Sequence, residues 1–336
     1  MKVPKAISIS LPILILAIAV YFSGQYLQKK SDLKFSKTEV KKVERLEAKK
    51  TLVEPLIERF KYLSIEDNHK AEKSAYRFPS VSRVRVGLVY EMNKGKTLWS
   101  SGANKSVPIA SLTKCLTILT VLDHIKANPQ HSLLDQVLIS KSSMQTSSSS
   151  FLRKYPKDTI SVEELLISAM VKSANDSCQL LAEYFGHGNS NNFIAMMNLK
   201  AKELGMKQTK ISNAHGLPFN RERPELDNHS SMSDLLHLIR KSIHDYPMIL
   251  KWTSSREVLL PKNSRKPVRL GNTNPLLGVK GVNGYKTGFT INAGWCQIVS
   301  VRSNGKFYFM AITGCPSKNT RDVTMRALLN WAVRVP

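Results

Sequence analysis

Two kinds of hydrophobic repeat alternate along this chain, and their order restricts its fold more than any other feature. Alternation every second residue is typical of strands with one buried face, and it occurs at 83–91, 96–100, 257–260, 268–270, 295–302 and 306–313. Helical spacing occurs between these groups and at the C-terminus, at 112–127, 162–171, 176–185, 191–204, 232–242 and 321–333. Strands from both ends of this region are therefore expected to share one sheet. The pattern predicts an α+β fold, with an antiparallel sheet flanked by helices and an inserted all-helical lobe.

Three regions differ in composition. Residues 1–27 hold a nearly continuous apolar run that follows two lysines, which is typical of an export signal or a short membrane anchor. An uncleaved anchor is favoured, because the candidate cleavage site at 17–19 lies inside the apolar run. Residues 28–80 are rich in charge, with apolar residues at loosely helical spacing, and predict a helical stalk or an extended linker. Residues 81–336 are expected to form the folded domain.

The net charge is strongly positive, and most of the excess belongs to the folded part. Of the formal charge of +25, residues 1–80 contribute 16 basic and 9 acidic residues, which leaves +18 on the remainder. A basic surface suits nucleic acid, anionic lipid or an anionic polymer such as cell-wall glycan-peptide. The sequence has no zinc-finger spacing, no aromatic-plus-glycine RNA-binding signature and no heptad repeat with a basic extension, so nucleic acid is not expected as a partner.

The four cysteines do not form a chemical motif. They are too few to cross-link a chain of 336 residues, and none lies in a Cys-x-x-Cys pair that would indicate a metal or redox site. We expect four small buried side chains and no metal centre. Cys115 would share a helix face with Ser111, but a thiol nucleophile would need a base of its own.

A Ser-x-x-Lys motif marks the first candidate for chemistry. Ser111 lies where a loop gives way to an apolar helical run, a position at which a lone serine is ordinarily a helix cap. Lys114 follows three residues later and would face the same side of the helix, which brings an amine within reach of the hydroxyl. To accept a proton at pH 7 this lysine must be held neutral, at a cost of about 4–5 kcal/mol from its reference pKa. Burial or a second nearby cation lowers that cost.

Two further motifs follow along the chain. Ser173 and Asn175 lie between two helical runs and could be simple caps, or a proton relay and an amide-binding group. Lys286, Thr287 and Gly288 form a Lys-Thr-Gly triplet, in which Lys286 is either a solvated lysine at a strand edge or the second cation. Together with the first motif, they indicate an acyl-transfer site.

In this order, the three motifs resemble the active-site signature of penicillin-binding proteins and serine β-lactamases. Segments 108–117, 212–218, 229–231, 269–276 and 281–288 resemble more specifically the serine-type D-alanyl-D-alanine carboxypeptidases, which are the low-molecular-mass penicillin-binding proteins. The resemblance covers roughly Val81 to Val333, and it implies the β-lactamase/transpeptidase-like fold for the whole domain.

The resemblance also implies a role for each motif residue. Ser111 would be the acylated nucleophile, Lys114 its base and Ser173 the group that shuttles the proton. The backbone N–H groups of Ser111 and Phe289 would form the oxyanion hole.

Substrate binding is implied for the remaining motif residues. Asn175 would bind a substrate amide, and Lys286 would supply positive charge. Thr287 would help to hold the terminal carboxylate of the substrate, and Gly288 would also belong to the substrate-binding site.

The reaction implied is removal of the last D-alanine from peptidoglycan pentapeptides through an acyl-enzyme, with no cofactor. The implied partners are peptidoglycan stem peptides, β-lactams as covalent inhibitors, and the membrane through the N-terminal segment. The implied location is the extracytoplasmic face of the bacterial envelope, with an anchor in the inner membrane.

Some positions depart from the family pattern, and alternatives stay open. Ala214 stands where many relatives have proline. Residues 315–316 (Cys-Pro) occupy a segment that in some relatives supplies an arginine near the substrate carboxylate. The cation that completes carboxylate binding is therefore undetermined. A β-lactamase would need a deacylating glutamate, and the segment 223–227 has arginine at the matching position. A D,D-endopeptidase acting on cross-links uses the same acyl-enzyme, and a catalytically silent wall-binding protein could keep the fold.

Overall fold

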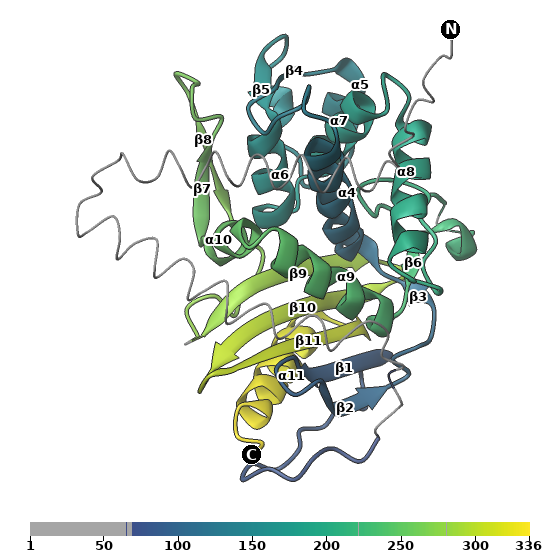
Figure 1. The fold of residues 1–336 in the computed structure, drawn as a ribbon, viewed down its shortest axis with the longest axis vertical. Helices are drawn as coiled ribbons and strands as arrows, with labels where there is room; N and C mark the ends of the chain where they lie inside the picture. Colours follow the sequence, from purple (N-terminus) through teal and green to yellow (C-terminus); the bar gives the residue numbers. More distant parts are fainter. Residues whose placement is uncertain (1–64, 66–68, 221, 280) are drawn as a thin grey trace, which may run out of the picture. The chain divides into compact units, whose positions relative to one another are not determined.

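The computed structural model describes residue 65 and residues 69–220, 222–279 and 281–336 (Figure 1). Its centre is a five-stranded antiparallel sheet with the strand order β2-β1-β11-β10-β9. The strands are β1 (Val86–Glu91), β2 (Lys96–Ser101), β9 (Val282–Thr290), β10 (Gly294–Ser303) and β11 (Lys306–Cys315). Because β1 pairs with β11, the sheet joins both ends of the domain, which confirms the predicted fold class.

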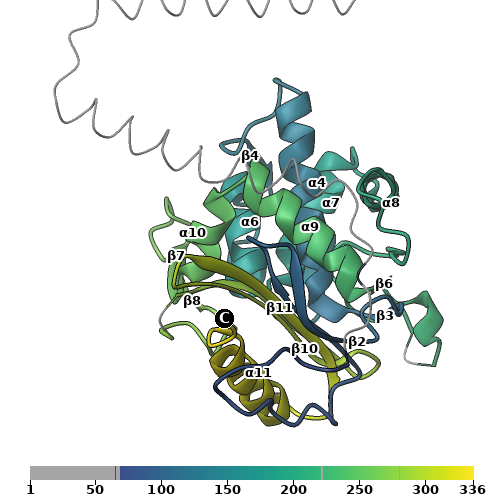
Figure 2. The same cartoon turned by 60° about the horizontal axis from the view of Figure 1, so that its bottom comes forward.

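Alternation along the strands produces two cores, one on each face of the sheet. On β11, Phe309 and Ala311 belong to the core beneath the helical lobe, whereas Tyr308, Met310 and Ile312 belong to the core beneath the C-terminal helix. Figure 2 shows this helix, α11 (Lys318–Ala332), on the face opposite to the lobe. Both faces of the central strands are therefore buried.

The helical lobe is inserted between the two groups of strands. Its elements are α4 (Lys114–Ala127), α5 (Lys141–Gln145), α6 (Val162–Val171), α7 (Asn175–Phe185), α8 (Ser190–Glu203), α9 (Met232–Asp245) and α10 (Met248–Ser254). Helix α4 is buried along most of its length, and α6 begins with a reciprocal capping box between Ser161 and Glu164. The first sequence motif lies where a short 3-10 helix, Ala110–Thr113, leads into the buried α4, at the junction of lobe and sheet.

Short strand pairs complete the domain. They are β3 (Val107–Pro108) with β6 (His229–Ser230), β4 (Gln136–Leu138) with β5 (Thr159–Ser161), and β7 (Glu257–Leu260) with β8 (Val268–Gly271). The predicted strands at 257–260 and 268–270 thus pair with each other as a separate hairpin and do not join the main sheet. The chain after β8 continues through Asn272 and Thr273, which line a cavity together with Ser111.

The described part of the predicted stalk lies on the domain. Ile65 is buried in the lobe core, and the Phe78 ring packs edge-on against Trp331 with their centroids 4.9 Å apart. The Ser74 hydroxyl donates to the Trp331 carbonyl at 3.1 Å. The packed part of the chain therefore begins before Val81, because residues 69–80 cover apolar surface around α11.

In the described part of the chain, no helix has both the length and the apolar character needed to cross a membrane. The predicted anchor at 1–27 and the predicted stalk at 28–64 and 66–68 lie outside the described residues.

Candidate active site

The nucleophile candidate lies on a tight turn that several contacts hold in place. Ser111 belongs to a short 3-10 helix, Ala110–Thr113, that leads into α4 and does not cap it by a side-chain hydrogen bond. Ala110 has a positive φ of 48°, a conformation that is uncommon for a residue with a Cβ. Gly216 approaches it so closely that a Cβ at position 216 would lie 2.0 Å from the Ala110 carbonyl oxygen. Only glycine fits at 216, and its close packing against Ala110 helps to hold the turn that presents Ser111.

Lys114 lies directly beside Ser111 and is fully buried. Its Nζ lies 2.9 Å from the Ser111 Oγ, 2.7 Å from the Asn175 Oδ1 and 2.5 Å from the His215 carbonyl oxygen. Burial lowers the pKa of Lys114 to about 8. At pH 7 the neutral amine then costs about 1.4 kcal/mol, in place of the 4–5 kcal/mol of a solvated lysine.

The partners of Lys114 also decide what its neutral form can do. The Asn175 Oδ1 and the His215 carbonyl accept hydrogen bonds but cannot donate them. A neutral amine gives its two hydrogens to these oxygens, and its lone pair is then left to face the Ser111 hydroxyl. The site therefore orients Lys114 as a proton acceptor for Ser111.

The second motif is held by a serine-rich loop. The Asn175 Nδ2 donates to the carbonyls of Ser147 and Ser148, each at 3.1 Å, and its backbone N–H donates to the Ser149 carbonyl at 2.9 Å. These bonds fix which side of the amide faces Lys114. Ser173, with a positive φ of 63°, lines the same cavity as Ser111.

The third motif lies on the edge strand β9. Lys286 is 1% exposed, and its Nζ donates to the Thr287 carbonyl at 2.9 Å. Burial, together with the positive charge of Lys114, lowers the pKa of Lys286 to about 7. Lys286 is thus a buried neighbour of Lys114 and not a solvated lysine at a strand edge.

Gly288 allows β9 to approach the nucleophile turn. A Cβ at this position would lie 3.0 Å from the Ser111 nitrogen and 3.2 Å from the Ala110 Cβ. Both distances are shorter than ordinary contacts of such atoms. The glycine therefore brings the backbone of Phe289, the next residue, close to the backbone of Ser111, the arrangement that an oxyanion hole requires.

One cavity of about 550 Å³ unites the three motifs. Ser111, Ser173, Asn175, Thr287, Gly288 and Phe289 all line it, while Lys114 and Lys286 lie buried behind it. The three sequence motifs, which lie at 111–114, 173–175 and 286–288, therefore meet at one place.

The cavity also contains a cation that the sequence analysis did not assign. Arg321 on α11 lines it, is 2% exposed, and has its guanidinium 5.4 Å from the centroid of the Trp295 ring. It lies six residues after Cys315, just beyond the segment in which some relatives have an arginine. In the sequence, Arg321 stands on the apolar side of an amphipathic helix, and this unusual position could have indicated a functional role.

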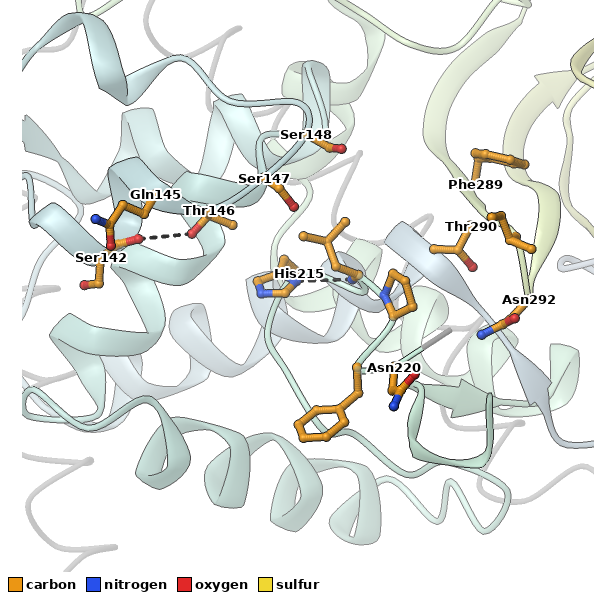
Figure 3. Close-up of a pocket in the computed structure, with 14 residues that line it drawn as sticks. Ser142, Gln145, Thr146, Ser147, Ser148, His215, Asn220, Phe289, Thr290 and Asn292 are labelled. Carbon is orange, nitrogen blue, oxygen red and sulfur yellow. Dashed lines mark hydrogen bonds between the residues drawn. The ribbon is translucent and has the colours of Figure 1, made fainter. Parts of the chain in front are cut away.

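A second cavity of about 700 Å³ adjoins the first and shares Ser148, Leu217 and Phe289 with it (Figure 3). Figure 3 shows the serine-rich loop on one side and the end of β9 on the other. No charged side chain is among its lining residues, all of which the structure describes. Burial and the charge of Lys114 lower the pKa of His215 to about 3, so this ring, which also lines the cavity, is neutral.

The cysteines are packed as predicted. All four are buried and free, and burial raises the pKa of Cys115 to about 12, which removes it as a competing nucleophile. Among the described residues, no group of three or more His, Cys, Asp or Glu side chains could hold a metal ion.

Comparison with known proteins identifies the family. Residues 79–314 match the family model described as D-alanyl-D-alanine carboxypeptidase, peptidase S11. The chain belongs to this family. It is 28% identical over 249 residues to D-alanyl-D-alanine carboxypeptidase DacF of Bacillus subtilis, an alignment that covers 74% of this chain and 61% of the relative. The chain thus spans about three-fifths of the length of that protein.

Two further relatives bear on the function of the site. A D-alanyl-D-alanine endopeptidase of Pseudomonas aeruginosa is 31% identical over 248 residues, which cover 73% of this chain and 75% of that protein. Penicillin-binding protein D2 from Listeria monocytogenes, solved in its ampicillin-bound form, superposes with a TM-score of 0.65 at 29% identity, covering 75% of this chain and 98% of that one. The fold and family expected from the motifs are therefore confirmed.

Proposed function

We propose that this chain is a serine D,D-carboxypeptidase, which removes the terminal D-alanine from peptidoglycan pentapeptides through an acyl-enzyme. The observation that carries the proposal is the contact of 2.9 Å between the Lys114 Nζ and the Ser111 Oγ, with Lys114 buried and its pKa lowered to about 8. Membership of the D-alanyl-D-alanine carboxypeptidase family supports the substrate. The acyl transfer proposed for Ser111 and Lys114 requires no cofactor.

Acylation begins when the Ser111 Oγ attacks the carbonyl carbon between the last two D-alanines. Lys114 takes the hydroxyl proton, and the backbone N–H groups of Ser111 and Phe289 stabilise the oxyanion. When the peptide bond breaks, Lys114 passes this proton through Ser173 to the nitrogen of the leaving D-alanine and is neutral again. Water then gives a proton to Lys114 and attacks the ester carbonyl. As the ester C–O bond breaks, Lys114 returns the proton to the Ser111 Oγ and the shortened peptide is released.

The terminal carboxylate fits the end of the cavity that contains Arg321 and Thr287. A planar guanidinium is suited to pair with a carboxylate, and Arg321 is nearly fully shielded from solvent. Lys286 adds positive charge or a hydrogen-bond donor behind the strand. Asn175 serves mainly to orient Lys114, because both hydrogens of its side-chain amide are donated to carbonyls of the serine-rich loop. To bind the Asn175 side-chain amide nitrogen, a substrate would have to displace one of these hydrogen bonds.

The test is release of D-alanine from a pentapeptide by the full chain and by Ser111→Ala. We expect release by the wild type and none above background by the variant. Covalent labelling with a fluorescent penicillin should likewise be lost in Ser111→Ala. Absence of both label and D-alanine in the wild type would favour a catalytically silent wall-binding protein.

A D,D-endopeptidase is the second candidate, and two observations favour it. One is the 31% identity to the endopeptidase of Pseudomonas aeruginosa, and the other is the cavity of about 700 Å³ beside the site, which offers room for more substrate. Digestion of purified muropeptides decides between the two. Loss of monomeric pentapeptide before cross-linked dimer supports the carboxypeptidase, and the reverse order supports the endopeptidase.

β-Lactams are proposed as covalent inhibitors that leave slowly. The ampicillin-bound form of the Listeria protein supports binding at this fold. Glu225 lies on an exposed short helix, pairs with Arg223, and lines neither cavity, so it is not placed to activate a deacylating water. Fast hydrolysis of penicillin in a turnover assay would instead indicate a β-lactamase.

For the whole chain, we propose an anchor at 1–27, a stalk at 28–80 whose last residues, 69–80, pack on the domain, and a catalytic domain at 81–336, on the extracytoplasmic face of the bacterial inner membrane. The apolar run and the peptidoglycan substrate of the family support this location. Membrane fractionation of the full chain and of a chain that lacks residues 1–27 tests it, and equal amounts of the two in the membrane fraction would refute the anchor.

A further inference from the structure

The hydroxyl of Thr287 in the Lys-Thr-Gly motif is already engaged inside the protein. Its Oγ1 donates a hydrogen bond of 2.6 Å to the Oγ1 of Thr273. A threonine hydroxyl has one proton to donate and otherwise only accepts. In this arrangement Thr287 presents lone pairs to the cavity, and lone pairs do not bind a carboxylate.

Thr273 lies on the chain between β8 and β9 and lines the same cavity as Thr287 and Arg321. Its backbone N–H donates to the Val171 carbonyl at 3.1 Å. Among the residues that the structure describes, no acceptor takes the proton of the Thr273 hydroxyl. This proton is therefore available to a group that enters the cavity.

The two neighbours of Thr273 fix its position. The Asn272 Nδ2 donates to the carbonyls of Thr253 and Ser255, at 3.0 and 2.9 Å. The Asn274 Oδ1 accepts from the Gln297 Nε2 at 2.9 Å, and Gln297 lies opposite Thr287 in the register of β10 with β9. The segment that carries Thr273 is thus tied both to α10 and to the strand next to the Lys-Thr-Gly motif.

We propose that Thr273 is a specificity-determining residue that donates its hydroxyl proton to the terminal carboxylate of the substrate. Thr287 donates to Thr273 and orients it, and Arg321 supplies the charge. This assignment rests on the proposed function, because the carboxylate is that of a peptide ending in D-alanine. A hydroxyl polarised by a second hydroxyl is a better donor than an isolated one.

The test compares two peptides ending in D-Ala-D-Ala, one with a free terminal carboxylate and one with a terminal carboxamide. For the free acid, Thr273→Val is expected to raise KM roughly tenfold or more, as for the loss of a hydrogen bond to a charged group, with kcat within about twofold. For the carboxamide the variant and the wild type should be alike. Thr273→Ser, which keeps the hydroxyl, should keep the preference for the acid.

Matched variants make the outcome decisive. Thr313→Val on β11 removes a buried hydroxyl that has no hydrogen-bond partner, so it should leave substrate preference unchanged and should not lower stability. Because Thr273 is only half-buried, Thr273→Ala provides a second variant that needs no repacking, and thermal unfolding checks both. Unchanged preference for the acid in Thr273→Val and Thr273→Ala, with its loss in Thr287→Val, would overturn the assignment in favour of Thr287.

The same assay separates the role of Thr273 from the carboxypeptidase activity itself. If the wild type releases D-alanine but does not prefer the free acid, the role of Thr273 is refuted and the carboxypeptidase stands. If the wild type cleaves neither peptide, the carboxypeptidase itself is refuted.

Discussion

Replacement of Gly288 by alanine tests how closely β9 must approach the nucleophile turn. The added Cβ would lie 3.0 Å from the Ser111 nitrogen, 3.2 Å from the Ala110 Cβ and 3.4 Å from the Leu112 nitrogen. Ordinary contacts of such atoms begin at about 3.5 Å, so the strand and the turn must separate by about 0.5 Å. This movement widens the gap between the Ser111 and Phe289 amides.

The expected cost follows from the chemistry of oxyanion holes. Complete loss of one donor costs about 10²- to 10³-fold in rate, and a misplacement of about 1 Å costs about 10²-fold. For Gly288→Ala we expect the acylation rate with a fluorescent penicillin to fall about 10- to 100-fold, which is about 1.4–2.7 kcal/mol.

Gly271→Ala is the matched control, because a Cβ at this end of β8 would meet no atom within 4 Å. It should acylate like the wild type, and urea unfolding should show both variants folded. If folded Gly288→Ala acylates within about twofold of the wild type, the close approach of β9 does not matter and the oxyanion-hole assignment is refuted.

Two further predictions concern the buried groups around the site. Asp176 is fully buried, and its carboxylate accepts hydrogen bonds from the backbone N–H groups of Phe151, Leu152 and Ser177, at 2.6, 2.7 and 2.9 Å. Asp176→Asn places an amide N–H₂ against a backbone donor, so it should lower the free energy of unfolding, measured in urea, by about 2 kcal/mol. A change under about 0.5 kcal/mol would contradict this prediction. Burial raises the pKa of the Cys115 thiol to about 12, so iodoacetamide at pH 8 should leave Cys115 unmodified in the folded protein and should modify it in urea. Peptide mass spectrometry measures the modification. Rapid modification of Cys115 in the folded protein would refute its burial.

The features of the fold and the site that depend on local residue spacing could be predicted from the sequence. The i, i+3 spacing of Ser111 and Lys114 is enough to bring their side chains together, and alternation in the strands is enough to indicate a sheet formed from both ends of the domain. The helix that carries the nucleophile differs in detail: Ser111 lies in a 3-10 turn before α4, because Gly216 and Ala110 fix the backbone there.

Other features could not be read locally, because tertiary contacts create them. Alternation did not predict strand β9, since its glycines at 284 and 288 interrupt the pattern, and pairing with β10 holds the strand in place. The burial of Lys286 depends on that pairing. The place of Arg321 depends on how α11 packs beneath the sheet, and a helical repeat does not reveal which cavity a side chain lines.

The central claim is that a buried, neutral Lys114 makes Ser111 nucleophilic, and the pH dependence of acylation tests it most directly. Because the active form is the deprotonated amine, acylation by a fluorescent penicillin should rise about tenfold per pH unit at low pH and level off above an apparent pKa near 8. The closely placed Lys286 titrates with Lys114, so this apparent pKa belongs to the pair. A rate that is independent of pH between 6 and 9, or one that keeps rising to pH 10 as for a solvated lysine, would contradict the account.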